Sequence, residues 1–134
     1  TIVDWFQQSC YDNPDMTPAE RNEMYNKMEK QFLPHMTTEG IPALQDGRRW
    51  QRQAHIFESP FYYIDYCFAQ FTALQFLALS QEDYKGAFAK YIKFLNFGGT
   101  KPFTELLSEC GLLSPFEEES FKLVVASCEK SLGL

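Results

Sequence analysis

At 134 residues the chain is long enough for one hydrophobic core and too short for two domains of ordinary size. Hydrophobic residues make up 45% of it and aromatic residues 16%, a composition that excludes a disordered chain. The formal net charge of −6 disfavours nucleic acids and membranes as partners, because phosphate backbones and anionic lipids repel an acidic protein. The composition therefore predicts a single globular unit.

The four cysteines, Cys10, Cys67, Cys110 and Cys128, lie far apart and form no C-x-x-C pair. Zinc fingers and redox motifs are therefore disfavoured. We expect four reduced, largely buried thiols in a cytoplasmic protein, with a pair of disulfides as the alternative. No secretory leader is visible. The chain begins at Thr1 without methionine, so we expect the true start to lie upstream.

The residue patterns that mark helix starts and helix ends along the chain predict an all-α fold. No two alternating apolar runs are joined by a hairpin turn, so strands are not expected. A bundle of about seven helices is predicted at residues 1–12, 17–34, 47–57, 60–79, 81–97, 102–110 and 115–131, with the longest loop at 37–47.

Capping patterns mark several helix ends. Thr17 and Glu20 flank a proline as in a capping box, and Ser114 and Glu117 repeat that pattern before the last helix. Gly111, followed by an apolar residue, is typical of a Schellman ending. The fifth helix carries the clearest apolar stripe, at steps of three and four: Tyr84, Phe88, Tyr91, Ile92 and Leu95.

The fourth helix is predicted to begin at Ser59 and Pro60, a cap followed by a first-turn proline. The apolar run over 61–79 is long enough to suggest a membrane span, but Asp65 and Gln70 interrupt it and no basic loop flanks it. It predicts a helix buried on nearly all sides instead. Such a helix needs neighbours around its circumference, which favours a piece of a larger protein.

One histidine and three tyrosines are the candidate functional residues. His55 precedes the fourth helix, and Tyr62, Tyr63 and Tyr66 fall in its first two turns. Spacings of three and four place Tyr66 on one helix face with each of the other two. Neutral imidazole and phenol groups can donate hydrogen bonds to a peptide carbonyl as it becomes an oxyanion. Spacing equally allows the alternative that these tyrosines are core residues.

No metal site is expected within the chain. His35 and His55 are its two histidines, and neither belongs to an H-x-x-H or H-E-x-x-H pattern. His35 follows a predicted helix end, where its charge would complement the helix dipole.

Two stretches closely resemble the C-terminal catalytic region of oligoendopeptidase F, in the thimet-oligopeptidase-like family of zinc metallopeptidases. They are residues 49–57 (RWQRQAHIF) and 60–70 (PFYYIDYCFAQ). Weaker resemblance extends over nearly the whole chain, in residues 3–7, 11–14, 17–21, 91–95, 98–102, 105–107 and Gly111.

The resemblance implies a division of roles. In such enzymes zinc binds to an H-E-x-x-H helix and a downstream glutamate, while a histidine and tyrosines on a later segment bind the substrate backbone and the tetrahedral intermediate. By motif match, His55, Tyr63 and Tyr66 take the catalytic roles here, with Tyr62 as a substrate-binding neighbour. The zinc ligands and the general-base glutamate are not in this chain. Residues 1–134 would thus be a single all-α C-terminal subdomain, inactive in isolation.

The implied partners are short peptide substrates and the N-terminal remainder of the same enzyme. Self-association of the isolated chain is also expected, since its missing neighbours would leave apolar surface exposed. Two other interpretations stay open at this point: a helical interaction module without chemistry, and a degenerate paralogue that lost its metal site.

Overall fold

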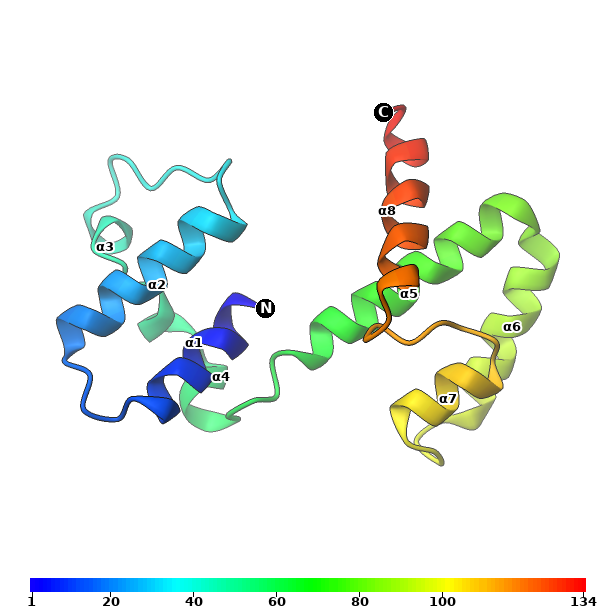
Figure 1. The fold of residues 1–134 in the computed structure, drawn as a ribbon, viewed down its shortest axis with the longest axis horizontal. Coiled ribbons are helices and arrows are strands. Elements are labelled where there is room, and N and C mark those ends of the chain that lie inside the picture. The colour runs from blue at the N-terminus through cyan, green and yellow to red at the C-terminus, as the bar shows by residue number, and fades with distance from the viewer. The chain divides into compact units, whose positions relative to one another are not determined.

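The computed structural model describes residues 1–134, apart from the side chain of Ala43, and its ribbon is drawn in Figure 1. These residues form eight α-helices and one 3₁₀ helix, and none of them lies in a strand. The predicted all-α fold is confirmed. The helices are α1 (Ile2–Asp12), α2 (Pro18–Phe32), α3 (Pro42–Gln45), η1 (Arg48–Arg52), α4 (Ala54–Glu58), α5 (Asp65–Glu82), α6 (Tyr84–Phe97), α7 (Phe103–Glu109) and α8 (Glu118–Leu132).

The helices fall into two compact units. The N-terminal unit is Thr1–Cys67 and the C-terminal unit is Phe68–Leu134. Helix α5 begins in the first unit and continues into the second.

The core of the N-terminal unit is built around Phe6 of α1, which is 1% exposed. Its ring centroid lies 5.0 Å from that of Tyr25 in α2 and 5.1 Å from that of Trp50 in η1. The indole nitrogen of Trp50 donates a hydrogen bond of 2.9 Å to the side-chain oxygen of Asn22. A buried indole needs such a partner for its N–H. Helix η1 is thereby attached to the α1–α2 pair.

The predicted capping box at the start of α2 is confirmed. The Thr17 hydroxyl accepts from the backbone N–H of Glu20, and the Glu20 carboxylate accepts from the backbone N–H of Thr17 at 2.7 Å. The matching pattern at Ser114 does not start a helix, because α8 begins at Glu118. The Ser114 hydroxyl instead accepts from the backbone N–H of Phe116 within a turn. The prediction of a helix from residue 115 was wrong by three residues.

The core of the C-terminal unit gathers where α7 ends. Gly111 has a φ of 64°, and its N–H donates to the carbonyl of Ser108, while the N–H of Leu112 donates to that of Leu107. This is the predicted Schellman motif, and its two apolar residues meet in the core. The buried members are Leu106, Leu107, Cys110 and Leu112, with Phe76, Leu79, Phe94, Phe97 and Phe103 packed around them.

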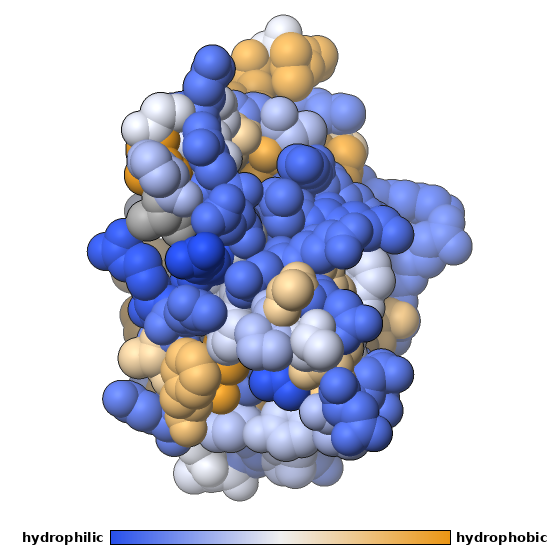
Figure 2. Space-filling model, turned by 90° about the vertical axis from the view of Figure 1, so that its left-hand side faces the viewer, coloured by the Kyte–Doolittle hydropathy of each residue, from blue (hydrophilic) through white to orange (hydrophobic). Residues whose placement is uncertain are grey.

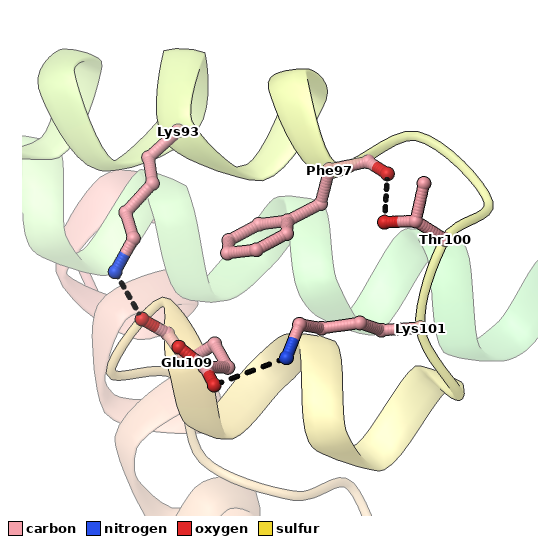
Figure 3. A network of polar contacts seen from close by, with 5 residues as sticks. All are labelled: Lys93, Phe97, Thr100, Lys101 and Glu109. Carbon is pink, nitrogen blue, oxygen red and sulfur yellow. Dashed lines mark hydrogen bonds and ion pairs between the residues drawn. The ribbon is translucent and has the colours of Figure 1, made fainter.

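Polar contacts close the turn between α6 and α7 (Figure 3). Lys93 donates to the backbone carbonyl of Glu109, and Lys101 forms an ion pair of 3.2 Å with the Glu109 carboxylate. The ammonium groups of both lysines lie over the ring of Phe97, at 5.8 and 5.7 Å from its centroid. The Thr100 hydroxyl donates to the carbonyl of Phe97. Both cations thus lie near the negative end of α7, where the helix dipole favours positive charge.

Helix α5 is buried along one side and not around its whole circumference, so the predicted full burial was wrong for this chain. Its buried residues are Thr72, Gln75 and Ala78. Gln75 exchanges two hydrogen bonds with the backbone of Leu113, at 2.8 and 2.9 Å. A buried amide is tolerated where its donor and its acceptor both find partners. Two polar residues of the apolar run, Thr72 and Gln75, therefore face the protein, whereas the predicted interruptions Asp65 and Gln70 are exposed.

The apolar stripe of α6 is largely exposed, although Tyr91 packs against Phe76 of α5 with their ring centroids 5.4 Å apart. Only Ala87 of this helix is buried. The exposed fraction of the stripe residues runs from 41% at Tyr91 to 69% at Tyr84. By contrast, the face of the N-terminal unit that Figure 2 shows is largely hydrophilic, and its hydrophobic side chains form small separate groups.

The four cysteines are free, as predicted. Only Cys110 is fully buried, so the predicted burial holds for one of the four thiols. Among the helices that the structure describes, none combines the length and apolar character needed to cross a membrane.

Candidate active site

The chain enters the candidate site through a sharp turn at residues 59–62. The N–H of Tyr62 donates to the carbonyl of Ser59 at 3.2 Å, and Phe61 has a φ of 62°. A proline followed by a residue of positive φ is typical of a type II turn, and it prevents a helix from starting here. The helix start predicted at Ser59 and Pro60 is therefore a turn in the structure.

Helix α5 therefore begins at Asp65 and not at residue 60. Tyr62 and Tyr63 lie in the turn region before the helix, and only Tyr66 lies within it. The prediction that all three tyrosines share one helix was wrong. His55 lies inside the short helix α4, which is separated from η1 at Gln53, so the predicted single helix over 47–57 was also wrong.

The turn nevertheless brings the four predicted side chains together. The centroid of the His55 ring lies 4.8 Å from that of Tyr63, 6.1 Å from that of Tyr66 and 6.2 Å from that of Tyr62. Tyr66 lies 5.3 Å from Tyr63 and 5.6 Å from Tyr62 by the same measure. We call these four residues the His–Tyr cluster. Residues that the sequence separates by a turn thus form one group of hydrogen-bonding rings.

The His–Tyr cluster is open to solvent. Tyr62 is 48% exposed and Tyr66 is 52% exposed, while His55 and Tyr63 are half-buried. Within this chain, Tyr62 and Tyr66 are therefore not core residues. Hydrogen bonding and proximity to Tyr62 raise the pKa of the Tyr66 phenol, so it keeps its proton well above neutral pH. Tyr66 is thus a neutral hydrogen-bond donor.

The side chain of Gln53 contacts the ring of His55. The Nε2 atom of Gln53 lies 2.9 Å from the Nδ1 atom of His55. The backbone of the same short segment is fixed by Gln7, whose buried side chain donates to the carbonyl of Ile56 at 3.4 Å. The imidazole therefore has a defined partner on one of its two ring nitrogens.

A hollow of about 340 Å³ lies beside the cluster and is lined in part by Tyr25, Glu29, Arg49, Gln53 and Tyr63. Glu29 is buried and forms an ion pair of 3.2 Å with Arg49. Burial raises the pKa of Glu29, and the Arg49 guanidinium opposes that rise. Burial also raises the pKa of Tyr25, to about 12. Arg49, which is partly exposed, thus places a cation in the wall of this hollow, paired with the Glu29 carboxylate.

Sequence reasoning missed Gln53 and the Glu29–Arg49 pair. Gln53 precedes His55 by two residues in a short linker, and no periodic pattern predicts which way its side chain points. Glu29 follows Tyr25 by four residues in α2, so their spacing placed both on one helix face. That spacing was the available signal for a buried carboxylate in α2.

The residues present do not fit a metal. Across the part of the chain that the structure describes, no group of three or more histidine, cysteine, aspartate or glutamate side chains could hold a metal ion.

Comparison with known proteins shows the family of the chain. Two solved structures match 98% of the chain with a TM-score of 0.89: an oligoendopeptidase F at 44% sequence identity, and PZ peptidase A with an inhibitor at 43%. The chain spans 23% of the first protein and 24% of the second. No curated protein matches it. The profile of Peptidase family M3 matches residues 1–123, and the chain belongs to that family.

Proposed function

We propose that this chain is the C-terminal part of a zinc metallo-endopeptidase that hydrolyses short peptides. In this proposal residues 1–134 form one subdomain that supplies the substrate- and oxyanion-binding side of the active site. His55, Tyr63 and Tyr66 are catalytic, and Tyr62 binds substrate. The observation that carries the proposal is the convergence of these four rings in a chain that belongs to Peptidase family M3.

The chemistry of the His–Tyr cluster suits an oxyanion. Hydrolysis of a peptide bond turns its carbonyl oxygen into an anionic tetrahedral centre. Donors preorganised for that charge stabilise the transition state more than the ground state. Phenols with high pKa values and a neutral imidazole donate hydrogen bonds without giving up their protons at neutral pH.

In the proposed enzyme, zinc is bound by residues outside this chain and supplies Lewis-acid activation. The N-terminal remainder of the enzyme is then a partner of this chain. We further propose a cytoplasmic location, which the four free cysteines support.

The test is a peptidase assay on the full-length protein that contains this chain, with short peptides as substrates. Tyr66→Phe removes one hydroxyl and should lower kcat by roughly 10²–10³ while zinc content stays unchanged. Tyr84→Phe is the matched control, since Tyr84 lies in α6 outside the cluster, and it should leave kcat unchanged. An unchanged kcat in Tyr66→Phe would remove Tyr66 from the mechanism.

The upstream sequence separates the remaining alternatives. An H-E-x-x-H helix encoded before Thr1 supports the peptidase. Its replacement by a helix without those residues would indicate a degenerate paralogue. A helical interaction module without chemistry would show no peptidase activity in the wild-type protein.

A further inference from the structure

We infer that Gln53 is a positioning residue that fixes His55 as the tautomer with its ring proton on Nε2. The inference rests on the proposed function for its catalytic meaning. The family resemblance does not determine which of the two ring nitrogens of His55 carries the proton and can donate to substrate.

The contact between Gln53 and His55 decides the tautomer. The amide nitrogen Nε2 of Gln53 carries two hydrogens and no free lone pair, so it can only donate. It lies 2.9 Å from His55 Nδ1, which must therefore accept. A neutral imidazole that accepts at Nδ1 carries its proton at Nε2. The partner of one ring nitrogen thus sets the chemistry of the other.

The backbone of Gln53 is fixed on both sides, which makes the contact a preorganised one. Its N–H donates to the carbonyl of Trp50 at 3.0 Å, and its carbonyl accepts from the N–H of Ile56 at 3.0 Å. Trp50 is in turn attached to the core through Phe6 and Asn22. The hydrophobic core therefore determines where the amide of Gln53 lies, and that amide determines the state of His55.

The consequence for catalysis concerns the proton at Nε2. With the proton there, the ring donates a hydrogen bond from Nε2 while it stays neutral. With the proton on Nδ1, Nε2 would instead present a lone pair, which would repel a developing oxyanion. Gln53 would thus act on the reaction through His55 without touching the substrate.

The tautomer can be measured without any peptidase activity. Nitrogen-15 NMR of the 134-residue chain distinguishes a protonated from an unprotonated ring nitrogen, and the chain has two histidines. His35→Gln, at an exposed position, identifies the signals of His55. At a pH where the ring is neutral, we expect Nδ1 to be unprotonated and Nε2 to be protonated. A protonated Nδ1, which would mean that the Gln53 amide is rotated, overturns the inference.

Gln53→Glu supplies the reverse case. A carboxylate accepts where the amide donated, so the proton should move to Nδ1. In the full-length peptidase, kcat should then fall by about 10- to 100-fold. Gln51→Glu places the same charge on an exposed residue two positions earlier and should change neither the ring signals nor kcat. An unchanged tautomer in Gln53→Glu contradicts the inference.

The two proposals fail separately. The expected tautomer in a protein without peptidase activity leaves the role of Gln53 on the ring intact and rejects the proposed function. An active peptidase whose His55 carries its proton on Nδ1 rejects the role of Gln53 and leaves the proposed function standing.

Discussion

At the scale of single residues, the stability of the region around the His–Tyr cluster depends on the ion pair that a buried carboxylate forms. Glu29 is 6% exposed, and its carboxylate would be costly there without the guanidinium of Arg49. The pair also lines the hollow beside Tyr63. The buried carboxylate of Glu29 thus lies next to the proposed site. Its effect on the free energy of unfolding can be measured as a function of pH.

We expect Arg49→Met to destabilise the N-terminal unit by about 1–2 kcal/mol at neutral pH, a value reduced for the partial exposure of Arg49. Burial raises the pKa of Glu29, so its contribution to stability is present below the ordinary glutamate pKa and is lost as pH rises through the raised one. Removing Arg49 raises that pKa further. The deficit of the variant should therefore be largest at neutral pH and vanish in acid.

Urea unfolding followed by tryptophan fluorescence measures this effect in the relevant unit, because Trp5 and Trp50 are the two tryptophans of the chain and both lie there. Arg48→Met is the control: Arg48 pairs with Asp46 at the surface, where both side chains are more than half exposed. A deficit in Arg49→Met that is the same in acid as at neutral pH would contradict the assignment of the effect to the Glu29 charge.

At the scale of elements, one glycine determines how η1 approaches α2. Gly47 has a φ of 70° and precedes η1. A Cβ atom at this position would overlap the backbone carbonyl of Asn22 in α2. Only a residue without a Cβ allows the two backbones to lie so close while adopting this conformation. The placement of Trp50 and Gln53 follows from that approach.

Gly47→Ala should therefore destabilise the N-terminal unit by about 2–4 kcal/mol, from the positive φ and from the overlap together. Gly40→Ala is a matched control with a φ of 79° and no atom within 4 Å of the added Cβ. It should cost about 1 kcal/mol, from φ alone. The difference between the two variants in tryptophan-monitored urea unfolding measures the overlap. Equal losses would refute a close approach of η1 to α2.

At the scale of the whole chain, exposed aromatic residues are its most conspicuous surface feature. They occur in both units, and in the C-terminal unit they lie on α6, on the segment that leads into α8 and on α8 itself. Phe116 is 68% exposed and Phe88 is 52% exposed. Relatives about four times as long share this fold at a TM-score of 0.89. An exposed apolar stripe such as that of α6 is typical of a face that another part of a protein covers.

We therefore expect the isolated chain to self-associate and to bind a hydrophobic dye, with a mass above that of a monomer in light scattering. Phe88→Lys in α6 should lower both signals, since it places a charge in the middle of the stripe. Tyr11→Lys, at an exposed position on α1, is the control and should change neither. A clean monomer that binds no dye would weaken the inference that a further part of the protein covers this face.

The sequence determined the helical class, the capping box at Thr17, the Schellman ending at Gly111 and the identity of the four cluster residues. Those features depend on side chains within a few positions of one another, where backbone hydrogen bonding and spacing decide the outcome. The order and approximate span of most helices followed from the same local signals.

Only the tertiary structure decided where helix α5 starts, that η1 and α4 are separate, and that Gln53 lies against His55. The pattern Ser59-Pro60 is compatible both with a helix cap and with a type II turn, and the choice depends on the φ of Phe61 and on contacts outside the segment. Long-range contacts likewise decide which polar group becomes buried, as for Glu29, Gln7 and Gln75. Such contacts join residues that are tens of positions apart, and local periodicity carries no information about them.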